Sequence, residues 1–305
     1  MSKELDKLCI NAIRVLSADA IEKAQSGHPG LPLGAATMAF TLWTKMNHNG
    51  NNPKWDNRDR FILSAGHGSM LEYSLLHLFG YGITIDDIKN FRQVGSLTAG
   101  HPEYGHTKGV EITTGPLGQG ICNAVGMAIA EAYLAEKFNR SSYNIVDHYS
   151  YAICGDGCLM EGISGEASSL AGTLGLGKLI VLYDSNNISI EGNTDIAFRE
   201  DVSKRYEGYG WQVLKVEDGN DIDAVSNAID EAKRDKARPS IIIVKNVIGF
   251  GCPAKQGKAS AHGEPLGAEN VIALKENLGW KLEPSFYVPD EVYKNMDKYI
   301  GEGIW

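Results

Sequence analysis

The stretch that decides the fold is residues 149–187, YSYAICGDGCLMEGISGEASSLAGTLGLGKLIVLYDSNN. Residues 149–154 and 178–184 are short, strongly apolar runs, which is typical of buried strands. Between them, residues 159 to about 174 have the length and composition of a helix. A strand-helix-strand unit returns the chain to a neighbouring parallel strand. The stretch therefore predicts two adjacent parallel strands that both end in polar, glycine-rich turns.

The same alternation extends on both sides of this unit. We expect further helices at residues 5–25, 33–46, 84–91, 117–138 and 222–233, and further strands at residues 60–64, 211–216 and 241–245. Nearly all-apolar strands that alternate with helices predict an α/β fold, a doubly wound, mainly parallel sheet with helices on both faces. We expect one domain over residues 1–265. Residues 266–305, with helical stretches at 268–278 and 290–299, form a C-terminal appendage or linker.

Composition excludes several classes of protein. The 305 residues are 43% hydrophobic and carry 29 Lys and Arg against 38 Asp and Glu, a net charge of −9. This balance gives no basic footprint for nucleic acid or for an anionic membrane surface. No run approaches the about 18 consecutive apolar residues of a membrane span, and the first residues lack the apolar core of a signal peptide. Five scattered cysteines without a CxxC pair suggest reduced thiols. We expect a cytoplasmic protein.

Polar residues follow the two strands of the deciding stretch. Gly155, Asp156 and Gly157 come after the first, and Asn186 follows the second, 30 positions after Asp156. Ligands of parallel α/β sheets bind at the carboxyl ends of the strands. A carboxylate and an amide oxygen are hard ligands that suit Mg²⁺ or Ca²⁺ shared with a phosphate, and the two glycines let the backbone approach that phosphate. This pattern resembles the thiamine diphosphate motif.

Four further blocks precede this motif in fitting order: SGHPG (26–30), SAGHG (64–68), GHPE (100–103) and TTGPLGQG (113–120). The motif itself lies in a fifth block, GDGCLMEG (155–162). Together they resemble the successive motifs of transketolases from about residue 5 to residue 265. The resemblance implies the thiamine diphosphate-binding fold and, more narrowly, the N-terminal, diphosphate-binding domain of that family. It implies thiamine diphosphate and Mg²⁺ as cofactors, with Ca²⁺ or Mn²⁺ as substitutes.

The resemblance also implies a role for individual residues. The metal ligands would be Asp156, Asn186 and the carbonyl of Ile188. Catalytic imidazoles would be His28, His67, His101 and His262. Cofactor contacts would come from His67, Gly115, Pro116, Leu117, Gly155, Asp156, Gly157, Glu161, Asn186, Ile188 and His262. Imidazoles suit the chemistry, because sugar hydroxyls must lose and regain protons near neutral pH.

Some assignments have a plainer alternative. A glycine-flanked histidine can be a turn residue, and His48, His77, His106 and His148 lack motif context, so we interpret these four as structural or surface residues. Asp184 is either a residue that orients a ligand or a strand-end cap, and we favour the cap. Glu161 lies at a position that resembles a dimer-contact carboxylate of relatives, although a solvated helix face is the alternative.

The resemblance implies transfer of a two-carbon ketol unit from a ketose phosphate to an aldose phosphate, the chemistry of the pentose phosphate pathway. Transketolases usually continue with a pyrimidine-binding domain, so we expect this chain to need such a half, in trans or as a continuation, and to be inactive alone. The chain would be an expressed fragment, a truncated product or a subunit of a split enzyme. We also expect it to form a homodimer. The alternatives are the N-terminal part of 1-deoxyxylulose-5-phosphate synthase, an E1-type 2-oxoacid dehydrogenase subunit, or a non-catalytic cofactor-binding module.

Overall fold

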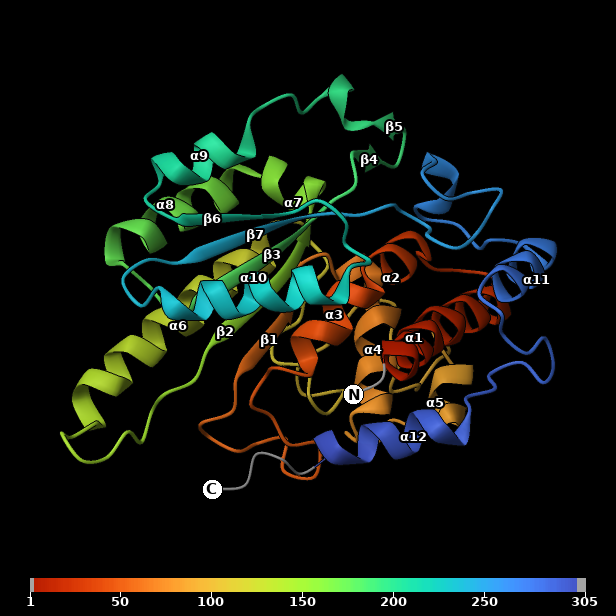
Figure 1. Cartoon of the computed structure of the whole chain (residues 1–305), viewed down its shortest axis with the longest axis horizontal. Helices are drawn as coiled ribbons and strands as arrows, with labels where there is room; N and C mark the ends of the chain where they lie inside the picture. The colour runs from red at the N-terminus through yellow and green to blue at the C-terminus, as the bar shows by residue number, and fades with distance from the viewer. Residues whose placement is uncertain (1–2, 301–305) are drawn as a thin grey trace.

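The centre of the molecule is a five-stranded parallel sheet. The computed structural model describes residues 3–300. Its strands run in the order β1 (Arg60–Leu63), β2 (Ser150–Gly155), β3 (Leu179–Ser185), β7 (Ser240–Lys245) and β6 (Gln212–Val216) (Figure 1). The three central strands consist almost wholly of buried apolar residues, as strands covered on both faces must. The expected α/β fold with a parallel sheet is confirmed.

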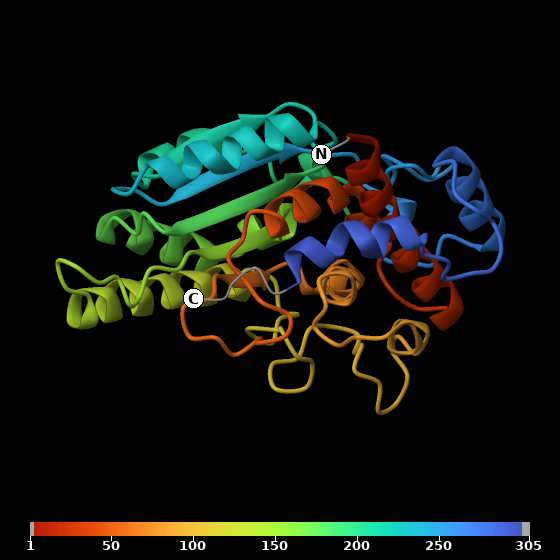
Figure 2. The ribbon, with the colours of Figure 1, turned by 60° about the horizontal axis from the view of Figure 1, so that its bottom comes forward.

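Helices cover both faces of the sheet (Figure 2). One layer contains α6 (Gln119–Phe138), α8 (Gly162–Leu174) and α9 (Val202–Gly208), and the other contains α1 (Lys3–Ala24), α3 (Ala36–Trp43) and α10 (Ile222–Arg234). From β1 the chain passes to β2, to β3 and then to β6 at the far edge of the sheet, and these connections include the helices of the first layer. It returns from β6 to β7 through α10. Right-handed crossovers produce this division between the two faces.

The helices differ from expectation at four places, one of which is α9, a helix that the sequence did not predict. The helix expected at residues 33–46 is two helices, α2 (Gly30–Gly34) and α3, and the one expected at 159–174 is α7 (Asp156–Met160) and α8. The second break falls at Glu161, whose backbone is extended. Helix α4 (Ser69–Leu78) was not expected. It is buried along almost its whole length, so its sequence carries no polar face and no amphipathic period.

The remaining elements are short. Helix α5 (Ile85–Lys89) opens with a capping box, in which Thr84 and Asp87 exchange side-chain and backbone hydrogen bonds. The others are β4 (Ile188–Ser189), β5 (Gly192–Asn193), α11 (Ala268–Asn277), α12 (Asp290–Met296) and the 3₁₀ turns η1 (Gly66–Gly68), η2 (Thr194–Ile196), η3 (Ala259–Ala261) and η4 (Asp297–Tyr299).

The C-terminal segment packs against the first helix. Both α11 and α12 contact α1, and Val292 and Met296 of α12 are buried in the main core. The Tyr293 hydroxyl lies 2.9 Å from Nε2 of His77 on α4. The expected division of the chain at residue 265 stays a prediction. In the part of the chain that the structure describes, no helix is both long and apolar enough to cross a membrane.

Candidate functional site

Four strands of the sheet deliver polar residues to one edge. His67 follows β1, the Gly155–Gly157 turn follows β2, Asn186 follows β3, and the segment after β7 leads to His262. In the sheet, Gly155 pairs with Asp184, so the turns after β2 and β3 lie side by side. They border a cavity of about 350 Å³. The expectation that these motifs meet at the carboxyl edge is confirmed.

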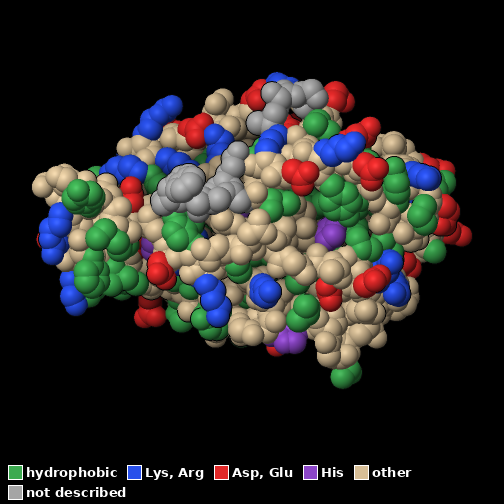
Figure 3. All heavy atoms as spheres, turned by 90° about the horizontal axis from the view of Figure 1, so that it is seen from below, with side chains coloured by type: hydrophobic (Ala, Val, Ile, Leu, Met, Phe, Trp, Pro, Cys, Tyr) green, Lys and Arg blue, Asp and Glu red, His purple; other side chains and the backbone are tan. Residues whose placement is uncertain are grey.

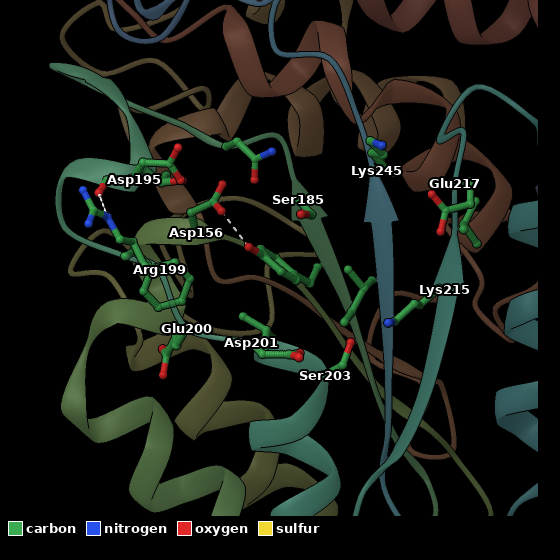
Figure 4. Close-up of a pocket in the computed structure, with 17 residues that line it drawn as sticks. Asp156, Ser185, Asp195, Arg199, Glu200, Asp201, Ser203, Lys215, Glu217 and Lys245 are labelled. Carbon is green, nitrogen blue, oxygen red and sulfur yellow. Dashed lines mark hydrogen bonds between the residues drawn. The ribbon is translucent and has the colours of Figure 1, made fainter.

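Asp156 is a buried carboxylate with one free oxygen. Its Oδ1 accepts a hydrogen bond of 2.6 Å from the Tyr183 hydroxyl, shown in Figure 4. Its Oδ2 is buried and has no hydrogen-bond partner in the structure. Burial raises the pKa of Asp156, and the hydrogen bond from Tyr183 opposes that rise. An unpaired carboxylate oxygen in such a place is costly unless a cation or a donor joins it.

The Asn186 carboxamide is held in a fixed orientation. Its Nδ2 donates to Oδ2 of Asp184 at 2.9 Å, and its Oδ1 accepts from the amide of Ile188 at 3.0 Å. Asp184 is itself buried, and its Oδ1 accepts from Nδ2 of Asn246 at 2.8 Å. Burial raises the pKa of Asp184 to about 7, against the hydrogen bond from Asn246. Asp184 therefore orients two carboxamides, and the strand-end cap favoured from sequence is wrong.

These donors fit a hard divalent cation. Asp156 offers a free carboxylate oxygen, Asn186 an amide oxygen with a second lone pair, and Ile188 lies beside them on the same cavity wall. Oxygen donors of this kind suit Mg²⁺ and Ca²⁺. A Cβ built on Gly155 would meet nothing within 4 Å, so the backbone there faces open space that a phosphate could enter.

Three imidazoles that line the same cavity form a cluster. The ring centroids of His28 and His67 lie 5.1 Å apart, those of His67 and His262 5.1 Å, and those of His28 and His262 5.8 Å. They come from three separate loops. His101 lies outside this contact set, with its ring against Gly115.

Burial keeps the clustered imidazoles neutral. It lowers the pKa of His67 to about 3 and that of His28 to about 4, and the neighbouring imidazoles lower both further. Burial also lowers the pKa of His262 and of His101. Neutral imidazoles each carry one donor and one acceptor, so near neutral pH they can exchange protons with a hydroxyl. An anion in the cavity would raise these pKa values.

The structure gathers most of the residues predicted for the site. The cavity is lined by His28, His67, Gly115, Leu117, Gly155, Asp156, Gly157, Asn186, Ile188 and His262. Three predicted residues are not among the lining residues of the described chain: His101, Pro116 and Glu161. Glu161 is exposed, with its Cβ close to Gly118 on the outer side of the turn. The role predicted for each residue stays a prediction.

Sequence reasoning missed three residues near the site. Asn246 directly follows β7, so the rule that located Asn186 could have found it. Tyr183 lies inside β3 and looked like an ordinary core residue. Arg92 lies on a loop far from any strand end, yet its Nη2 is 3.5 Å from Nδ1 of His28. The contact of Arg92 with His28 depends on how that loop folds back, and no sequence pattern predicts this path of the loop.

The four remaining histidines have other surroundings. His48 is buried among Trp43, Phe79 and Tyr81. His77, His106 and His148 likewise lie away from the cavity lining.

A second cleft adjoins the first at Asp156. It has a volume of about 380 Å³ and opens between the carboxyl end of the sheet and the segment that leads into α9 (Figure 4). Its lining mixes charges of both signs, with Lys215 and Lys245 on β6 and β7 and acidic residues in the 195–201 segment.

Comparison with known proteins agrees with this geometry. The family model described as "Transketolase, thiamine diphosphate binding domain" matches residues 5–304. Transketolase of Geobacillus stearothermophilus is 59% identical over 303 residues, 99% of this chain and 45% of that protein. The crystal structure of Pichia stipitis transketolase with sedoheptulose-7-phosphate superposes with a TM-score of 0.97 at 49% identity, covering 99% of this chain and 44% of that one. Transketolase from Leishmania mexicana gives 0.96 at 50% identity, covering 98% and 45%.

The fold and the site thus define a thiamine diphosphate-binding α/β domain. The chain belongs to the transketolase family, as the thiamine diphosphate binding domain of that family. This match favours transketolases over the two enzyme families that the sequence left as alternatives. The chain spans less than half the length of the relatives it matches.

Proposed function

We propose that this chain holds the diphosphate end of thiamine diphosphate through a Mg²⁺ ion and serves as the diphosphate-binding part of a transketolase. The observation that carries the proposal is the unpaired, buried Oδ2 of Asp156, a residue that lines the cavity together with Asn186 and Ile188. A cation placed there would satisfy this oxygen and also neutralise a diphosphate. We also place the protein in the cytoplasm.

Each wall of the cavity has its own task in this proposal. Asp156, Asn186 and the Ile188 carbonyl hold the cation. The phosphates enter the open space at the backbone of Gly155 and accept from the amide of Gly157. The bound cofactor supplies an electron sink in its thiazolium ring. Leu117 and Gly115 form an apolar wall that excludes water from that ring.

The imidazoles handle protons and hydroxyls. His28, His67 and His262 are neutral and close together, so each can accept a proton from a sugar hydroxyl and return it. His101 meets the same substrate from the adjoining loop. We propose ketose and aldose phosphates as substrates, because the relatives are transketolases and one is seen with sedoheptulose-7-phosphate. The groups that grip the sugar phosphate and the cofactor's pyrimidine would come from the part of those relatives that this chain does not cover.

A complementation assay tests this function. The chain is mixed with the remaining part of the Geobacillus stearothermophilus transketolase, and ketol transfer from xylulose 5-phosphate to ribose 5-phosphate is followed. We expect turnover that requires thiamine diphosphate and Mg²⁺ in the mixture, and none from the chain alone. Calorimetric titration of the chain with the cofactor, with Mg²⁺ or with a chelator, is the parallel measurement. Metal-independent binding would refute the proposed site, and robust turnover by the chain alone would refute the need for a second half.

The partner surface that we propose is the exposed face of α6 and α8. These helices pack against each other and expose Tyr133, Phe138, Ile163, Leu170 and Leu174. Figure 3 shows hydrophobic side chains gathered at the end of the molecule where α6 lies. Contiguous exposed apolar surface of this kind marks an interface. We propose that a second copy of this chain covers it in a homodimer.

A charge on this face should separate the two copies. Leu170→Glu places a carboxylate in the centre of the proposed interface, where burial without a partner is costly. We expect its dimer dissociation constant, measured by sedimentation, to rise about tenfold or more. Ile272→Glu on α11 is the control, because Ile272 is 48% exposed and Leu170 47%, yet it lies on another surface. Equal association of both variants would exclude the α6–α8 face.

A further inference from the structure

Arg92 is a half-buried cation next to His28, one of the residues that line the cavity. It follows α5 in a loop and adopts a φ of 60°, a left-handed conformation that non-glycine residues seldom take. Its Nη1 donates to the Ser26 hydroxyl at 2.8 Å, and its Nη2 lies 3.4 Å from the carbonyl of Gly100. The guanidinium therefore joins the segment before His28 to the segment before His101.

No carboxylate pairs with this guanidinium. None of the ion pairs among the described residues includes Arg92, and its Nε is buried without a partner. A half-buried charge without a counterion loses part of its hydration and gains no ion pair in return. Packing alone does not explain why an arginine stands at this position.

The contact with His28 supplies that reason. Arginine is a donor only, so the Nδ1 atom that its Nη2 approaches at 3.5 Å can only act as an acceptor. The ring proton must then sit on Nε2. That atom lies on the other side of the ring, where a Cβ built on Gly263, next to His262, would be 3.3 Å away.

We propose that Arg92 is a positioning residue, which fixes His28 as a neutral imidazole with its proton on Nε2 and its ring turned toward the cavity. The inference deepens the function proposed above. The tautomer of His28 does not depend on that function, and only the catalytic role of the Nε2 proton rests on it. A protonated His28 would place an N–H against a guanidinium, so the contact would be lost and replaced by repulsion.

The other groups that face His28 act in the same direction. His67, His262 and His101 are themselves neutral imidazoles, and no acid lies among the groups that shift the pKa of His28. Burial lowers that pKa most, and His262, Arg92 and His101 lower it further, to about 4. Arg92 is the one permanent charge in this set, so its removal is the change that isolates its effect.

The test measures the pKa and the tautomer of His28 by nuclear magnetic resonance on the full chain with labelled histidine. Arg92→Met removes the charge and the donors while keeping a similar length. We expect the pKa of His28 to rise by about one unit and the Nδ1–H tautomer to become populated. Arg92→Lys keeps the charge without the planar fork, so the pKa should stay near its original value while the tautomer becomes mixed. The control is Arg140→Met, because Arg140 is exposed and bonds only to nearby carbonyls.

Each outcome decides the matter. An unchanged pKa and tautomer of His28 in folded Arg92→Met would overturn the proposal, whether or not the chain binds thiamine diphosphate. If that variant does not fold, Ser26→Ala replaces it, because the change removes the Nη1 partner and leaves the charge free to move. The tautomer of His28 should then become mixed, and a fixed Nε2–H form would contradict the proposal. His77, which bonds to the Ile83 carbonyl and to Tyr293, should be unaffected in every variant.

Discussion

Replacing Asp156 with alanine is expected to weaken the binding of thiamine diphosphate at saturating Mg²⁺ by about 100-fold or more. Loss of a residue that merely orients a metal ligand typically costs about 10–100-fold in affinity, so loss of the ligand itself should cost at least that much. Asp184 cannot take over this role, because its two oxygens already accept the amides of Asn186 and Asn246. Calorimetric titration of the chain with the cofactor measures the change.

The isosteric variant separates binding from folding. Burial raises the pKa of Asp156, so the ionised carboxylate weakens the cofactor-free fold. Asp156→Asn removes that charge and can still accept the Tyr183 hydrogen bond, so the melting temperature without cofactor should not fall. The rise in melting temperature that cofactor and Mg²⁺ produce should disappear. Asp195→Asn is the matched control, since Asp195 lines the adjoining cleft only. A cofactor-dependent rise that survives in Asp156→Asn would leave the metal site without support.

The sequence predicted the parts of the site that depend on strand ends. Asp156, Asn186 and His67 each follow an apolar strand directly, and parallel strands bring their carboxyl ends to one edge, so local pattern and topology together place them. The convergence of His28 and His262 on this edge followed only from the resemblance to transketolases. Neither directly follows a strand: His28 lies in the short segment between α1 and α2, and His262 lies in the long segment between β7 and α11.

Features set by long-range packing were missed. Arg92 reaches His28 through a loop that folds back across 64 positions of sequence, and nothing local marks that contact. The break between helices α7 and α8 at Glu161 falls inside a run of residues with good helical composition. It arises because α7, which carries Asp156, ends before α8 begins. Asp184 was misread because a strand-end aspartate commonly caps, and only the positions of both asparagine side chains reveal what it does.

Replacing Lys275 with methionine is expected to lower the free energy of unfolding by about 3–5 kcal/mol, because the buried carboxylate of Asp19 loses its partner. Lys275 of α11 and Asp19 of α1 form an ion pair of 2.8 Å with side chains only 4% and 3% exposed. The second oxygen of Asp19 accepts the amide of Phe286 at 2.7 Å. Urea unfolding measures the loss. Lys89→Met is the control, since the Lys89–Asp86 pair is exposed and should contribute no more than about 0.5 kcal/mol.

A second substitution shows whether the loss of stability comes from the unpaired carboxylate of Asp19. Adding Asp19→Asn to Lys275→Met removes the stranded charge while an amide oxygen still accepts from Phe286, so part of the stability should return. No recovery would mean that packing, and not the ion pair, holds the segment. The pair borders a small core in which Ala18 of α1 meets Val271 and Leu274 of α11. Helix α1 ends at Ala24, four positions before His28. Residues after 265 therefore stabilise the helix end from which the first imidazole of the cluster is presented.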